Sequence, residues 1–75
     1  TVVLDDEIDR NELTRRINTV IEQLPHDYQV VLRLKYMEQK KVQEIAHTLR
    51  LSFKAAESLI YRARRAFIVL YSKTS

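Results

Sequence analysis

The 75-residue sequence contains no cysteine, no glycine and no tryptophan, and it has a single proline. Without cysteine there is no disulfide framework and no thiolate metal site, which fits a reducing compartment. Because glycine and proline mark the tight turns between strands, their scarcity leaves no β-hairpin signal. The sequence also has neither an apolar run of the roughly 20 residues that cross a bilayer nor a signal-peptide pattern. We therefore expect a soluble, cytoplasmic, all-α protein.

Residue types that perform catalysis or bind metals are present but do not gather. His26 and His47 have no third ligand at metal spacing. No serine, histidine and acid fall in a triad-like pattern, and no glycine loop is available to hold a phosphate. A chain of this length also needs most of its apolar residues for one core. We expect no enzyme activity, no metal and no cofactor.

Charge is divided unevenly along the chain. Residues 1–28 carry seven acids and three bases, a net of −4, whereas residues 29–75 carry ten bases and three acids, a net of +7. Basic charge concentrated in one part of a small domain is expected of a phosphate-binding surface. A solvated face on an ordinary basic domain explains the same charge equally well.

Apolar spacing predicts four helices within one domain. Residues 1–9 are predicted to be a linker or a frayed start, and residues 10–75 are predicted to be the folded domain. Because the chain starts at Thr1 rather than methionine, we expect it to be a fragment of a longer protein. Asp9 and Glu12 resemble a capping box, so an ordered helix is expected to start near Asp9. Pro25 ends that helix and suits the first position of the next. The second helix is predicted to extend to Tyr36. The ring of this tyrosine is expected to lie in the core, with its hydroxyl at the surface.

The last two predicted helices are separated by a very short turn. Residues 42–49 have apolar side chains at the spacing of one helical face. Ser52 then occupies an N-cap position. The helix that follows has a continuous apolar stripe of Phe53, Ala56, Ile60, Ala63, Phe67 and Leu70. This pattern predicts a four-helix domain with a C-terminal helix-turn-helix, whose second helix would enter the DNA major groove.

The positions opposite this stripe supply the candidate DNA contacts, which are Lys54, Ala55, Glu57, Ser58, Tyr61, Arg62 and Arg65. Residues near the helix start reach base edges, so the candidate readers are Lys54 to guanine, Ala55 to a thymine methyl, Glu57 to cytosine, and Ser58. Tyr61 would contact either bases or backbone. Arg62 and Arg65 are expected to contact phosphates, as are Lys40, Lys41 and Arg50 from the flanking loops.

Three neighbouring positions do not fit a simple DNA-binding face. Arg64 lies near the edge of the apolar stripe and is expected to pair with an acid of the first helix. Ile68 and Val69 project to the outer side of the last helix, where apolar side chains are a liability in water. They indicate a protein partner, unless the end of the helix simply packs against the first helix.

Four short patterns carry a family resemblance. They are Leu24-Pro25-x-x-Tyr28-x-x-Val31-Leu32, Tyr36-x-Glu38, Glu44-Ile45-Ala46-x-x-Leu49-x-Leu51-Ser52 and Glu57-Ser58-x-x-x-Arg62-Ala63-Arg64. In this order and spacing they resemble region 4 of bacterial sigma factors, most of all the extracytoplasmic-function group. The resemblance implies a domain that binds the minus-35 promoter element in the major groove and docks on core RNA polymerase near the flap of its β subunit. It further implies possible control by an anti-sigma factor.

Some positions depart from the family pattern. Arg50 and Gln39 stand where the family usually has glycine, and a positive φ at Arg50 would cost a non-glycine residue about 1 kcal/mol. Lys41 replaces the usual serine cap, so Glu44 is expected to reach back in its place. Leu59 replaces an arginine beside the DNA, which predicts the loss of one phosphate contact.

Two other kinds of protein compete with the sigma-factor interpretation. A response-regulator output domain shares the Ile-Ala-x-x-Leu pattern, although the Leu-Pro-x-x-Tyr and Arg-Ala-Arg patterns argue against it. A helical module that only docks on proteins, with an incidental basic face, belongs to a different class. Weak DNA binding without sequence preference or steep salt dependence would favour that module.

Overall fold

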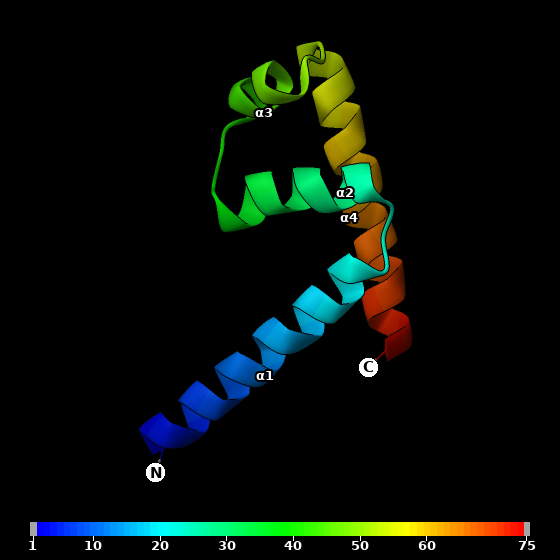
Figure 1. Cartoon of the computed structure of the whole chain (residues 1–75). Coiled ribbons are helices and arrows are strands. Elements are labelled where there is room, and N and C mark those ends of the chain that lie inside the picture. The colour runs from blue at the N-terminus through cyan, green and yellow to red at the C-terminus, as the bar shows by residue number, and fades with distance from the viewer. Residues whose placement is uncertain (1, 75) are drawn as a thin grey trace.

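The computed structural model describes residues 2–74, with side chains placed for residues 10–73. The described residues form helices joined by short turns and include no strand. Its elements are α1 (Val2–Glu22), α2 (His26–Leu32), the π-helical turn η1 (Arg33–Met37), α3 (Val42–Leu49) and α4 (Phe53–Thr74). Figure 1 shows α2 and α3 beside the first half of α4, while α1 meets the second half of α4 and extends away from it toward the N-terminus. The predicted all-α fold with four helices and a C-terminal helix-turn-helix is confirmed.

The first helix is longer than the sequence predicted. It begins at Val2 rather than near Asp9, and Thr1 lies outside the described residues. The proposed capping box involves the Asp9 side chain, which also lies outside the described side chains. The division between a start at residues 1–9 and a domain at residues 10–75 stays a prediction.

The corner between α1 and α2 is closed by local hydrogen bonds. Pro25 has φ −54° and ψ 151° and is the N-cap of α2, so it precedes the first helical residue rather than occupying it. The side-chain amide of Gln29 donates to the backbone oxygen of Leu24 at 2.9 Å and to that of Glu22 at 3.4 Å. These bonds satisfy carbonyls that the end of α1 would leave unpaired.

The second helix continues as the π-helical turn η1 before it ends. The amide of Glu38 donates to the oxygen of Arg33 at 2.9 Å, and Gln39 follows with φ 56°. Positive φ is the conformation that favours glycine, which accounts for the family's preference at this position. The wider turn leaves Tyr36 47% exposed, so the prediction of a core aromatic at this position is wrong.

The core is entirely apolar and lies where the end of α1, α2 and α3 meet the first half of α4. Its buried side chains are Val20, Ile21, Leu24, Val31, Leu32, Ile45, Ala46, Ala56, Leu59, Ile60 and Ala63. The prediction that Phe53 belongs to the buried stripe of α4 is corrected here. Phe53 is 48% exposed because it begins α4 ahead of Ala56, where the buried face starts, and Leu59 is only 7% exposed. Because α4 packs against both α2 and α3, its buried arc is wider than one stripe and includes position 59.

Candidate nucleic-acid interface

The corner between α3 and α4 is fixed by hydrogen bonds that end one helix and begin the next. Arg50 has φ 56° and ψ 45°, the left-handed conformation. Its amide donates to the oxygen of His47 at 3.2 Å, and the amide of Leu51 donates to the oxygen of Ala46 at 2.8 Å. This pair of bonds is a Schellman motif, which usually contains glycine. The turn was predicted to need a positive φ at position 50, and Arg50 adopts one although it is not a glycine.

Both helices of the corner start with the caps that the sequence predicted. The carboxylate of Glu44 accepts from the amide of Lys41 at 2.9 Å, which replaces the missing serine cap of α3. The hydroxyl of Ser52 accepts from the amide of Ala55 at 3.0 Å and caps α4. Each cap satisfies a helix-terminal N–H group and is worth about 1 kcal/mol. These bonds hold the start of α4 at a defined angle to α3.

The surface of α4 opposite the core collects most of the predicted contact residues. We call the exposed side chains of Lys54, Glu57, Ser58, Tyr61, Arg62 and Arg65 the outward face. Ala55 lies beside them and is half-buried. Among them Tyr61 is 58% exposed, although it is a large aromatic side chain. The sequence therefore identified a continuous solvent-facing strip on α4, and its contact with DNA stays a prediction.

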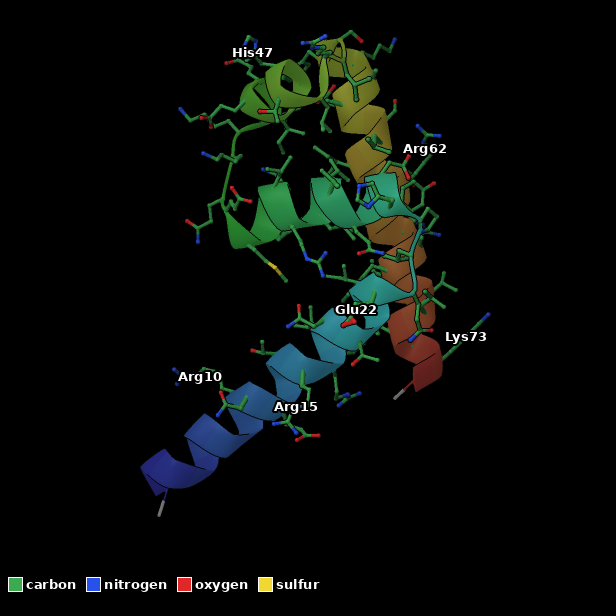
Figure 2. All side chains as sticks on the ribbon, viewed as in Figure 1. Arg10, Arg15, Glu22, His47, Arg62 and Lys73 are labelled. Carbon is green, nitrogen blue, oxygen red and sulfur yellow. The ribbon has the colours of Figure 1, made fainter. Side chains whose placement is uncertain are left out.

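The Arg62 side chain has a defined course on this face. Its Nε donates to the backbone oxygen of Ser58, one turn earlier, at 3.4 Å. The bond leaves the terminal guanidinium nitrogens available to an external acceptor. Figure 2 shows Arg62 projecting from α4 on the side away from α3. The guanidinium is thus directed outward rather than into the monomer.

The predicted contacts outside α4 lie at the two ends of α3. Lys41 precedes the first residue of α3 and Arg50 follows the last, and both are exposed, as is Lys40. With a rise of 1.5 Å per residue, an eight-residue helix separates its two ends by about 12 Å. The structure therefore does not bring Lys41 and Arg50 together, and their contact with phosphates stays a prediction.

Few carboxylates compete for the cations of this region. The ion pair found among the described side chains joins Arg15 to Glu12 at 3.8 Å, on α1. Near the outward face, the carboxylate of Glu44 caps α3 and Glu57 is exposed. The lysines and arginines of the helix-turn-helix therefore keep their charge available for an external anion.

Arg64 contacts a residue that the sequence did not indicate. Its guanidinium donates to the hydroxyl of Tyr36 in η1 at 3.1 Å, and among the side chains that the structure describes it forms no ion pair with an acid of the first helix. The two residues are 28 positions apart, so helical spacing gives no signal for the pair. The bond ties the middle of α4 to η1 beside the core.

A second surface lies further along α4. A groove with a volume of about 630 Å³ runs between α1, η1 and α4. Its apolar lining comes from Ile17, Ile21, Leu32, Met37, Phe67 and Ile68, and Arg64 stands at its edge. Ile68 is 50% exposed, as the sequence predicted for an outward apolar residue. Val69 is equally exposed, at 49%, but does not line the groove.

Comparison with known proteins assigns the family of the chain. The model of the family described as sigma-70, region 4 matches residues 14–67, which is more than half of the chain. The chain therefore belongs to the sigma-70 region 4 family, a DNA-binding family of transcription factors and not a catalytic one. Searches among curated proteins and among solved structures gave no match. The described helices include none with the length and apolar character to span a membrane.

Proposed function

We propose that this chain is the promoter-recognition domain of an alternative sigma factor of the extracytoplasmic-function group. It binds the minus-35 element with α4 in the major groove and docks on core RNA polymerase. The observation that carries the proposal is the outward face of α4, exposed and basic, on a capped helix-turn-helix of this family. The family match also favours a sigma factor over a response-regulator output domain.

The arrangement of cations supports binding with α4 in the groove. Lys41 and Arg50 lie at the two ends of α3, while Arg62 projects from α4 on the side away from α3 (Figure 2). The major groove is about 12 Å wide and has a phosphate strand on each side. A helix lying in the groove with cations on both sides therefore meets both phosphate strands. This arrangement fixes the register of the residues that read bases.

The apolar groove supports the second part of the proposal. Apolar side chains line it, and two of them, Met37 and Ile68, are about half exposed, which suits a protein partner. From α4 the groove is lined by Arg64, Phe67 and Ile68, none of which belongs to the outward face, so a protein bound there leaves that face open to DNA. We propose that core RNA polymerase occupies it, and that an anti-sigma factor would compete for the same groove.

Selection from a DNA library tests the DNA-binding proposal. The 75-residue chain is incubated with duplexes randomised over ten base pairs, and the enriched sequence is compared with a scrambled duplex in mobility-shift titrations at 50 and 200 mM salt. We expect one enriched sequence, bound at least tenfold more tightly than its scrambled version, with affinity for both falling steeply as salt is added. Equal binding to both duplexes with little salt dependence would instead indicate a module that only docks on proteins.

A further inference from the structure

Phe53, the first residue of α4, is in an environment that does not suit a phenylalanine. Its side chain is 48% exposed, although the apolar pattern of the helix predicts burial. Among the described side chains it belongs neither to the core nor to the apolar residues packed against the core. Leaving about half of an aromatic ring in water forgoes much of the stabilisation that its burial would supply. Packing within the monomer does not account for this residue.

The reason for the exposure is the position of the residue in the fold. The buried face of α4 starts at Ala56, so the first turn of α4 extends beyond the core. Figure 1 shows this end of α4 projecting past α2, with α3 beside it. In a helix-turn-helix, this turn is the part of the second helix whose side chains reach base edges. Phe53 is therefore placed with the candidate readers Lys54 and Ala55.

The surroundings of Phe53 favour nucleic acid over an apolar protein surface. The next residue is Lys54, and Arg50 and Ser52 lie just before it; all three are exposed and polar. A cation-rich border attracts phosphates and disfavours an apolar partner. Leu51 is 37% exposed and lies outside the helix, in the turn. The exposed ring is thus one apolar group in a polar, basic setting.

The chemistry of the major groove narrows what such a ring recognises. The base edges present hydrogen-bond donors and acceptors, which a phenylalanine does not pair with, and one apolar group, the 5-methyl of thymine. We propose that Phe53 is a specificity-determining residue that contacts a thymine 5-methyl group in the sequence bound by α4. This inference rests on the proposed function, and it assigns to Phe53 a reading role that the sequence pattern did not indicate.

The proposal is tested by removing the methyl group and the ring separately and together. In the duplex selected by the chain, each thymine is replaced in turn by deoxyuridine, which lacks only the 5-methyl group. Dissociation constants are measured for the unaltered chain, Phe53→Ala, Phe53→Leu and the control Leu51→Ala, with helix content checked by circular dichroism. At one thymine we expect deoxyuridine to weaken binding by the unaltered chain and by Leu51→Ala about fourfold, the effect of one buried methyl group.

The variants at position 53 give the decisive comparison. Phe53→Ala should bind the thymine and deoxyuridine duplexes alike, whereas Phe53→Leu should keep part of the difference. The proposal is overturned if the selected sequence contains no thymine, or if every deoxyuridine substitution affects the unaltered chain and Phe53→Ala equally. In either case the enriched sequence still supports the proposed function. Failure to enrich any sequence would overturn both.

Discussion

The two halves of α4 have the same kind of inner face but different outer faces. From Phe53 to Arg65 the residues facing solvent are mostly polar or basic, and the helix packs on α2 and α3. From Ala66 onward the solvent-facing residues include Ile68 and Val69. Under the proposed function, one helix supplies two binding surfaces, a charged one for DNA and an apolar one for protein.

The two halves are also held in place by different interactions. The first half starts at a hydrogen-bonded corner, with Ser52 as its cap and Arg50 in the left-handed conformation. In the second half, Phe67 and Tyr71 stack with ring centroids 5.6 Å apart, and the guanidinium of Arg16 from α1 lies 5.1 Å from the Tyr71 ring centroid. Directional bonds set the angle of the first half, whereas side-chain packing attaches α1 to the second half.

The largest expected effect comes from removing core volume beneath the first half. Ile45 of α3 is fully buried, and Ile45→Ala should lower the free energy of unfolding by about 2–5 kcal/mol, through lost burial and the cavity left behind. Thermal and urea unfolding followed by circular dichroism measure the change. Ile68→Ala makes the same chemical change at a half-exposed site in the second half and should cost less than about 1 kcal/mol. Similar losses for both variants would contradict the view that the two halves differ in what they pack against.

A smaller effect is expected at the apolar groove. Ile68→Asp places a charge in the groove and should weaken binding to purified core RNA polymerase about tenfold, as measured by fluorescence anisotropy. Val69→Asp is the matched control, because Val69 has almost the same exposure but lies outside the groove. DNA binding by both variants should stay close to that of the unaltered chain. Equal weakening by both substitutions would contradict the assignment of polymerase to this groove.

The smallest effects separate phosphate contact from base reading on the outward face. Arg62→Ala should weaken binding to all duplexes severalfold and reduce the slope of log affinity against log salt by about 0.9, the value for one phosphate. Lys54→Ala should instead relax the preference at one base pair. Mobility-shift titrations of both variants on the selected and scrambled duplexes measure this, with Arg10→Ala on α1 as a control for loss of charge. A change of sequence preference in Arg62→Ala, with its overall affinity intact, would show that the assignment of the outward face is wrong.

The features predicted most accurately were those decided by residues close together in the chain. The caps from Ser52 and Glu44 each act over three residues, so their chemistry is visible in the sequence. The turn at Arg50 is likewise set by bonds to α3 within five residues. The exposed strip on α4 followed from helical periodicity alone, because positions three and four apart share a face.

The sequence by itself determined the four helices, the caps of α3 and α4 and which side of α4 is polar, since all of these depend on local backbone chemistry and periodicity. Only the tertiary structure decided where the core ends along each helix. It buried Leu59 because α4 packs on two neighbours, and it exposed Phe53 because the first turn of α4 extends beyond them. It also paired Arg64 with Tyr36 across 28 residues. Burial and long-range contact depend on what lies opposite a side chain, and that is a property of the folded arrangement rather than of any one segment.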